Sequence, residues 1–206
     1  MAGGTVTPIE VGNEICDRAH ELGVAVHLDG ARVFNAAAHL GKSVQEITAK
    51  FDSVMFCLSK GLGAPVGSMV VSSTELIDRG RLYRKRLGGG MRQVGVLAAA
   101  GLIALEQMPW RLDEDHANAR LLADGLAAIP GISSDASKVQ TNIVIFDVAA
   151  TGTPAAQFSA MLKQRGVLAN PVSATTIRMV THMDVSRSDC ETALAACAEI
   201  AAQQRG

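Results

Sequence analysis

Two short β-prone runs, at residues 24–28 and 53–58, most constrain the fold of this 206-residue chain. Both runs are mostly apolar, and each is followed within three residues by a glycine that breaks the strand pattern. Helix-forming sequence lies between the two runs, and a further strand-like run follows at residues 68–71. This β-α-β-turn-β order predicts an α/β sheet with a right-handed crossover connection.

An ionisable residue follows each of the two runs. Asp29 comes directly after the first run, and Lys60 lies in the glycine-rich turn after the second. If the strands are parallel neighbours, both side chains lie at the sheet edge where ligands bind in α/β folds. Taken alone, Asp29 is better explained as the cap of a helix that begins near Ala31, and a lone lysine at a strand end is weak evidence for catalysis.

The combination of the two residues favours a specific chemistry. A partly desolvated lysine suits Schiff-base formation. Pyridoxal phosphate needs such a lysine to carry it as an imine, and an aspartate that keeps its pyridine nitrogen protonated. Asp29 and Lys60 at one sheet edge therefore predict a pyridoxal phosphate site.

Four segments together resemble a known family. They are His-Leu-Asp-Gly-Ala-Arg at residues 27–32, the lysine turn at 58–67, Gly-Gly-Gly-Met-Arg-Gln at 88–93 and Ile-Arg-Met-Val-Thr-His at 177–182. In this order they are similar to low-specificity L-threonine aldolase, a fold type I pyridoxal phosphate enzyme. The resemblance runs from Gly3 nearly to the C-terminus. It implies an α/β chain formed by the C-terminal part of a fold type I large domain and a small α+β domain.

The resemblance also implies roles for five residues. Lys60 would carry the cofactor, Asp29 would pair with the pyridine nitrogen, and Arg32 would lie near the cofactor phenolate and the substrate carboxylate. Arg178 would bind the α-carboxylate of an amino acid, which a guanidinium matches in a bidentate manner. Arg92 would lie near the cofactor phosphate, on the assumption that it starts a helix.

Each arginine has an alternative explanation that the sequence leaves open. Arg32 is otherwise a surface charge on a helix, and Arg92 a charge at a helix start. Arg178 is otherwise a structural ion pair or a charge on an edge strand. No His, Cys, Asp or Glu spacing typical of a metal site is present in the sequence, so we expect no metal.

The implied reaction is aldol cleavage of L-threonine, L-allo-threonine and related β-hydroxy amino acids to glycine and an aldehyde. A β-eliminating lyase or another fold type I enzyme is the closest alternative, and a non-catalytic remnant is the second. Members of the family are longer at the N-terminus, where their main phosphate loop and ring-stacking histidine lie. The resemblance therefore implies a partial sequence, and the general base stays unassigned.

Composition narrows the remaining classes. A net charge of −1 gives no electrostatic basis for binding nucleic acid or an anionic membrane. No apolar run approaches the length of a membrane span, and the N-terminus lacks the pattern of a signal peptide. The four cysteines show no paired spacing, so we expect reduced thiols in a cytoplasmic protein. The resemblance implies a homo-oligomer, either a dimer or a tetramer.

The chain is expected to form two domains that meet at Pro109. Residues 1–109 would form a partial pyridoxal phosphate-binding large domain, and residues 110–206 a small α+β domain. The segment at residues 94–108 is apolar nearly all round, so we expect its helix to be buried in the core or between subunits.

Overall fold

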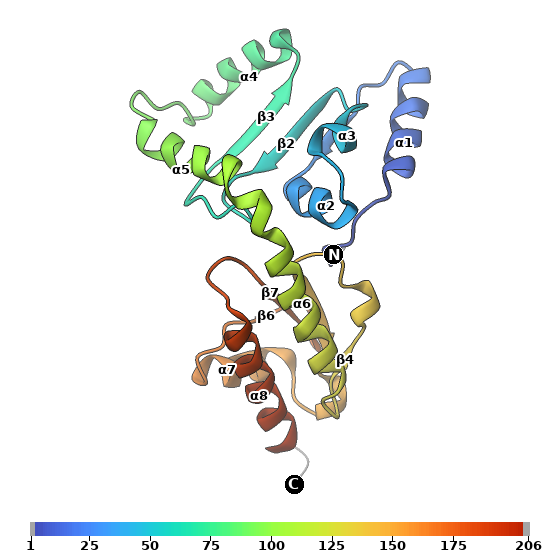
Figure 1. Ribbon diagram of the computed structural model, residues 1–206, viewed down its shortest axis with the longest axis vertical. Helices are drawn as coiled ribbons and strands as arrows, with labels where there is room; N and C mark the ends of the chain where they lie inside the picture. Colours follow the sequence, from blue (N-terminus) through green and yellow to red (C-terminus); the bar gives the residue numbers. More distant parts are fainter. Residues whose placement is uncertain (1–2, 204–206) are drawn as a thin grey trace. The chain divides into compact units, whose positions relative to one another are not determined.

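The computed structural model describes residues 3–203, which form two compact units (Figure 1). The N-terminal unit is Thr7–Leu112, and the C-terminal unit contains residues 3–6 together with residues 113–203. The division lies three residues beyond the expected junction at Pro109, because Leu112 is fully buried in the core of the N-terminal unit. Residues 3–6, expected with the first domain, pack with the second.

The N-terminal unit contains a three-stranded sheet of order β1-β2-β3. β1 and β2 pair in parallel, and β2 and β3 pair antiparallel, so the predicted α/β arrangement is confirmed. The elements of this unit are α1 (Ile9–Glu21), β1 (His27–Asp29), α2 (Val33–Leu40), α3 (Val44–Thr48), β2 (Ser53–Cys57), β3 (Ser68–Ser72), α4 (Thr74–Arg86), α5 (Gly95–Glu106) and the 3₁₀ helix η1 (Met108–Arg111).

The crossover between β1 and β2 consists of two short helices with well-defined ends. α2 ends at Gly41, whose φ of +61° is the left-handed conformation that glycine adopts at low cost. α3 begins with a capping box, in which the Ser43 hydroxyl accepts a hydrogen bond from the Glu46 N–H and the Glu46 carboxylate accepts one from the Ser43 N–H. These caps set the short path that brings β2 alongside β1.

Helix α5 differs from the expectation that it is buried within the core. In this chain Gly101 and Ala104 are its buried residues, whereas Val96 is 77% exposed and Leu102 57% exposed. Several large apolar side chains of α5 are therefore exposed in the described part of the chain. The helix has 12 residues, and among residues 3–203 no helix combines the length and hydropathy needed to cross a bilayer.

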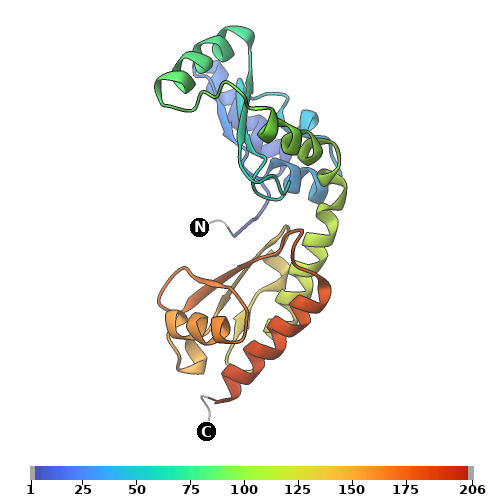
Figure 2. The ribbon, with the colours of Figure 1, turned by 90° about the vertical axis from the view of Figure 1, so that its left-hand side faces the viewer.

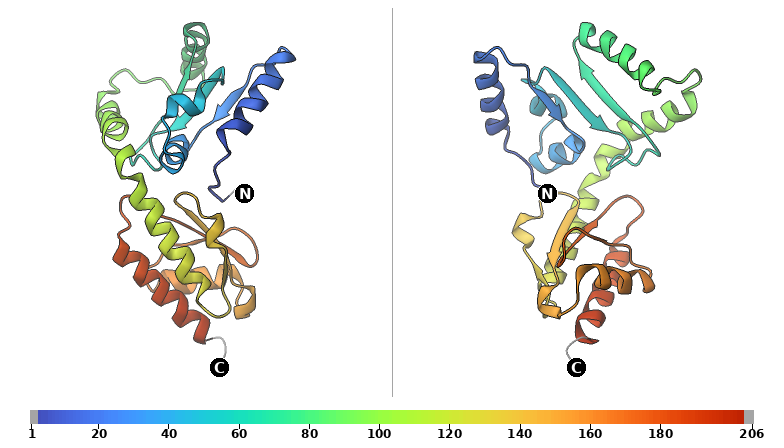
Figure 3. Two further views of the ribbon diagram at one scale, coloured as in Figure 1. Left: turned by 45° about the vertical axis from the view of Figure 1, so that its right-hand side comes forward. Right: turned by 180° about the vertical axis from the view of Figure 1, so that it is seen from behind.

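The C-terminal unit contains a four-stranded antiparallel sheet of order β4-β5-β7-β6. Three helices cover one face of this sheet, and α6 and α8 lie side by side (Figures 2 and 3). The elements are α6 (Leu112–Ala127), β4 (Ser133–Ser134), η2 (Ala136–Lys138), β5 (Ile143–Asp147), η3 (Ala149–Thr151), α7 (Ala155–Gln164), β6 (Asn170–Pro171), β7 (Thr176–Val180) and α8 (Arg187–Gln203).

Strand alternation separates the two faces of this sheet. Phe146 of β5 and Ile177 and Met179 of β7 point into the core, where they meet apolar residues of α6, α7 and α8. On the opposite face, a Cβ atom at Gly3 would lie 3.3 Å from Cδ1 of Ile145. The chain start is held there because the Thr141 hydroxyl donates to the Gly4 carbonyl at 2.6 Å.

Candidate functional site

Asp29 and Lys60 lie at the same edge of the N-terminal sheet. Asp29 is the last residue of β1, and Lys60 follows the end of the parallel neighbour β2 by three residues. Asp29 aligns with Met55 in the strand register, and the N–H of Gly30 continues the pairing by donating to the Met55 carbonyl at 2.8 Å. The sequence-based expectation that the two strands are parallel neighbours is therefore confirmed, and both side chains are exposed at that edge.

The backbone around Lys60 is held in a closed turn. The Gly63 N–H donates to the Lys60 carbonyl at 2.9 Å, and the Ala64 N–H donates to the Leu58 carbonyl at 3.0 Å. Leu62 is only 2% exposed, so its side chain anchors the turn in the core. Lys60 itself is exposed, which leaves its side chain accessible on a fixed backbone.

The residue after Lys60 must be glycine for reasons of space. A Cβ atom at Gly61 would lie 2.7 Å from Oδ1 of Asn35 and 3.2 Å from Cδ2 of Leu112. Asn35 is 2% exposed and lies on α2 between the buried residues Val33 and Ala37. Sequence reasoning gave Asn35 no role. A single polar residue at a buried position of an apolar helix was the signal that could have found it.

The loop between Asp29 and α2 shows what Asp29 does locally. Its Oδ1 atom accepts a hydrogen bond from the Ala31 N–H at 3.3 Å, within the turn before the helix. The N-cap of α2 is Arg32, and no side chain caps this helix end. The alternative in which Asp29 caps the helix is therefore wrong. Arg32 lies half-buried in this loop, three residues after Asp29.

Arg92 lies elsewhere in the N-terminal unit, in the loop between α4 and α5. Its side chain is exposed, and α5 begins only at Gly95. The expectation that Arg92 starts a helix is wrong, because the three glycines at positions 88–90 are followed by further loop residues. A role at a phosphate would therefore depend on its side chain and not on a helix N-terminus.

Arg178 is the predicted site residue of the C-terminal unit. It is half-buried on β7, in register with Ile145 of β5 and Asn170 of β6. Because residues alternate along a strand, it lies on the face opposite the core residues Ile177 and Met179. In this sheet β7 lies between β5 and β6, so the explanation of Arg178 as a charge on an edge strand is wrong.

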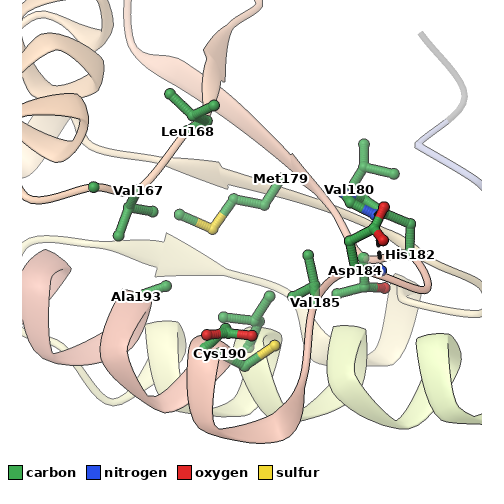
Figure 4. Close-up of a pocket in the computed structure, with 13 residues that line it drawn as sticks. Val167, Leu168, Met179, Val180, His182, Asp184, Val185, Cys190 and Ala193 are labelled. Atoms are coloured by element: carbon green, nitrogen blue, oxygen red, sulfur yellow. Dashed lines mark hydrogen bonds and ion pairs between the residues drawn. The ribbon is translucent and has the colours of Figure 1, made fainter.

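The C-terminal unit also has a cavity of about 400 Å³ beside α8 and β7 (Figure 4). Leu168 lies at one end. At the other end, Nδ1 of His182 lies 3.4 Å from a carboxylate oxygen of Asp184. Met179 contributes to its lining from the core face of β7, whereas Arg178 lies on the other face. None of the five predicted site residues lines this cavity.

The chain is similar in sequence to known proteins over nearly its whole length. The chain is 42% identical over 202 residues to the low specificity L-threonine aldolase of Escherichia coli (strain K12), which covers 98% of this chain and 56% of that protein. It is 41% identical over 189 residues to low-specificity L-threonine aldolase 1 of Arabidopsis thaliana, covering 91% of this chain and 53% of that protein. The chain thus spans about half the length of the curated relatives it matches.

A solved structure supports the fold. A Listeria monocytogenes protein described as a candidate L-allo-threonine aldolase superposes with a TM-score of 0.80 at 22% identity, covering 96% of this chain and 58% of that one. The predicted fold class, part of a fold type I structure, is therefore confirmed. The family model for beta-eliminating lyases matches residues 1–151, and the chain belongs to the beta-eliminating lyase family.

Proposed function

We propose that this chain carries part of the active site of a pyridoxal phosphate-dependent aldolase that cleaves L-threonine, L-allo-threonine and related β-hydroxy amino acids. The products would be glycine and an aldehyde. The observation that carries the proposal is the position of Asp29 and Lys60 at the ends of neighbouring parallel strands. The names of the relatives from Escherichia coli and Arabidopsis thaliana supply the substrate class.

The residues of this edge fit the cofactor. Lys60 offers an exposed primary amine on a fixed turn, and Asp29 offers an exposed carboxylate at the neighbouring strand end. The residue that follows each of them is a glycine, Gly30 and Gly61. A Cβ atom at either glycine would lie less than 3 Å from a neighbouring atom, so the backbone beside the site is closely packed. When bound, pyridoxal phosphate would act as the electron sink for cleavage of the Cα–Cβ bond.

The proposed roles follow from the chemistry of each side chain. The Lys60 amine would attach the cofactor covalently and would be displaced by the substrate amine. The Asp29 carboxylate would hold a proton on the pyridine nitrogen by charge-assisted hydrogen bonding. Arg32 would stabilise negative charge near the cofactor and the substrate. Its place at the start of α2, three residues from Asp29, supports this role.

Two further arginines complete the proposal. Arg178 would bind the substrate carboxylate through its guanidinium, which suits that planar group. Its half-buried position between two strands would limit its rotamers and so favour a defined geometry. Arg92 would contact the cofactor phosphate as a long, exposed cationic side chain.

β-elimination is the second candidate function, because the family is named for it. The two reactions share the carrier lysine and the electron sink and differ in the bond that breaks. A non-catalytic role is the third, because the chain spans about half the length of the relatives. The proposed test separates all three.

The test mixes the purified chain with pyridoxal phosphate and records the visible spectrum. Covalent attachment would produce a band at roughly 420 nm that is lost in Lys60→Ala. Lys42→Ala is the matched control, because Lys42 is exposed and forms a surface ion pair with Glu46. Acetaldehyde released from threonine would identify an aldolase, whereas ammonia released from a substrate with a β-leaving group would identify a lyase. A wild-type chain with no band would refute the idea that this chain binds the cofactor by itself.

We also propose a cytoplasmic homo-oligomer, either a dimer or a tetramer. The exposed apolar residues of α5 support self-association, because they resemble a contact surface more than a solvated helix. Within each subunit, residues 7–112 would belong to the cofactor-binding domain and residues 113–203 to the small domain. Light scattering coupled to gel filtration would test the oligomer, with Leu102→Glu expected to lower the measured mass.

A further inference from the structure

We propose that Asn35 is a positioning residue that fixes the backbone of the Lys60 turn relative to Asp29. The inference rests on the proposed role of Lys60 and adds a residue to which neither the comparisons nor the sequence motifs assign a role. Asn35 lies on α2, the helix that directly follows the Asp29 loop, and it reaches the turn that carries Lys60.

The side chain of Asn35 fills the space beside Gly61. The Oδ1 atom of Asn35 occupies the space where a Cβ atom of residue 61 would be, at 2.7 Å from the ideal Cβ position. The carboxamide therefore lies directly against the backbone of Gly61, the residue after Lys60. No larger residue fits at position 61 unless Asn35 moves.

The environment of Asn35 argues against a purely apolar packing role. The residue is 2% exposed and is flanked on the same helix by the buried apolar residues Val33 and Ala37. Buried amides occur where they are hydrogen-bonded, a requirement that a leucine of similar size does not have, so the choice of asparagine here points to a function for the polar group.

The connections of α2 show what the contact achieves. The helix begins beside Arg32, and the Val33 N–H donates to the Gly30 carbonyl at 2.8 Å. Gly30 is bonded in turn to Met55 of β2. One end of α2 thus holds the Asp29 loop, and Asn35, less than one turn further along, holds the Lys60 turn. The helix sets both proposed cofactor contacts from one rigid element.

The first experiment needs no cofactor. Hydrogen exchange of the Gly63 amide, which donates to the Lys60 carbonyl, reports directly on closure of the turn. We expect Asn35→Leu to speed this exchange at least tenfold. Ala37→Gly, at a buried position of the same helix, is the control and should change the exchange rate by no more than about twofold. The two variants are compared at urea concentrations that give them the same global stability. Exchange at the wild-type rate in Asn35→Leu would overturn the inference.

The second experiment reads the position of Lys60 itself. The full chain is incubated with pyridoxal phosphate, trapped with borohydride and mapped by peptide mass spectrometry. Asn35→Leu should lower the share of label on Lys60, relative to the other lysines, at least fivefold, and Asn35→Asp, which keeps an oxygen at the Oδ1 position, should restore most of it. An unchanged share, or no rescue by Asn35→Asp, would overturn the positioning role.

A third variant covers the case in which Asn35→Leu does not fold. Gly61→Ala places a methyl group against Oδ1, so it should open the turn in the wild-type background. The effect should be smaller in Asn35→Ala, which removes the closest atom and leaves Cδ2 of Leu112 at 3.2 Å. Equal effects in both backgrounds would overturn the inference. The two proposals can also fail separately. If Lys60 is not labelled although substitution of Asn35 changes the exchange rate of the Gly63 amide, the proposed function is refuted and the contact between Asn35 and the turn is established.

Discussion

Gly30 and Met55 join the two strand ends that carry the candidate site. The Gly30 N–H donates to the Met55 carbonyl at 2.8 Å, one residue beyond the end of β1. A Cβ atom at Gly30 would lie 2.9 Å from that same carbonyl oxygen. The close approach of the two backbones therefore depends on the absence of a side chain at position 30.

Gly30→Ala should destabilise the chain for this reason. The methyl group would push the Asp29 loop away from β2, at a cost of roughly 1–3 kcal/mol in the free energy of unfolding. The measurement is the urea midpoint by circular dichroism. Gly80→Ala is the control, because position 80 lies in α4 and a Cβ atom there would meet no atom of the described residues within 4 Å beyond its own stretch of helix. Alanine at position 80 should raise the free energy of unfolding by about 0.5–1 kcal/mol. A Gly30→Ala chain as stable as wild type would contradict the close approach.

Gly125 and Leu194 should be energetically coupled across the α6–α8 contact. A Cβ atom at Gly125 would lie 2.5 Å from Cδ1 and 3.1 Å from Cγ of Leu194. We expect Gly125→Ala to destabilise the wild-type chain, although alanine favours the helix by up to about 1 kcal/mol. In a Leu194→Ala background, where the space is free, the same change should be stabilising. A double-mutant cycle on the unfolding free energies tests this, and additive effects would contradict the contact.

The strand ends were predictable from the sequence because their signals are local. An apolar run followed by Asp29-Gly30, and another followed by Lys60-Gly61, mark where each strand stops, and the β-α-β order predicts that the strands are parallel. The roles assigned to Asp29, Arg32, Lys60, Arg92 and Arg178 stay predictions. The bounds of α5 agree closely with the apolar segment at residues 94–108, and Arg92 lies in the loop before that helix.

Features that depend on distant contacts were not predictable. The apolar composition of α5 indicates burial, but it cannot say whether the covering surface belongs to the same chain. Residues 3–6 pack with the C-terminal unit through individual hydrogen bonds, such as the one from the Thr141 hydroxyl to the Gly4 carbonyl. Such contacts leave no periodic pattern in the sequence. A polar Asn35 within an apolar helix was visible in the sequence, but its position beside Gly61 is seen only once α2 and the lysine turn are placed together.

The Asp147 carboxylate should make stability depend on acid pH. Its pKa lies below the ordinary value of 3.8, because the Thr175 hydroxyl donates to it at 2.6 Å and the Ala149 N–H donates at 2.7 Å. The Asp147 carboxylate binds a proton less readily in the folded chain than in the unfolded chain. Its contribution to the free energy of unfolding is therefore full above the ordinary pKa. It is lost as the pH falls from about 3.8 through the lowered value of the folded state.

Thr175→Val should therefore reduce this acid dependence, since it removes the largest cause of the lowered pKa. Urea midpoints measured from about pH 3 to about pH 7 would show a smaller loss on acidification than in wild type. Thr192→Val is the control, because its hydroxyl donates to a backbone carbonyl on α8 and not to a carboxylate. Identical acid profiles for wild type and Thr175→Val would contradict the assignment.

Cys197 should be inert to alkylation while the chain is folded. It is fully buried on α8, and burial raises its pKa to about 12, so almost no thiolate is present near neutral pH. Because the thiolate is the reacting form, iodoacetamide at about pH 8 should modify Cys197 only when the C-terminal unit opens. Mass spectrometry of peptides should show labelling that rises steeply through the urea transition and is slow below it.

Cys57, at the end of β2 with its sulfur 3.4 Å from the Ser68 hydroxyl, is the internal comparison in the other unit. Rapid labelling of Cys197 without urea, at the rate of a free thiol, would show that α8 does not hold this side chain in the core.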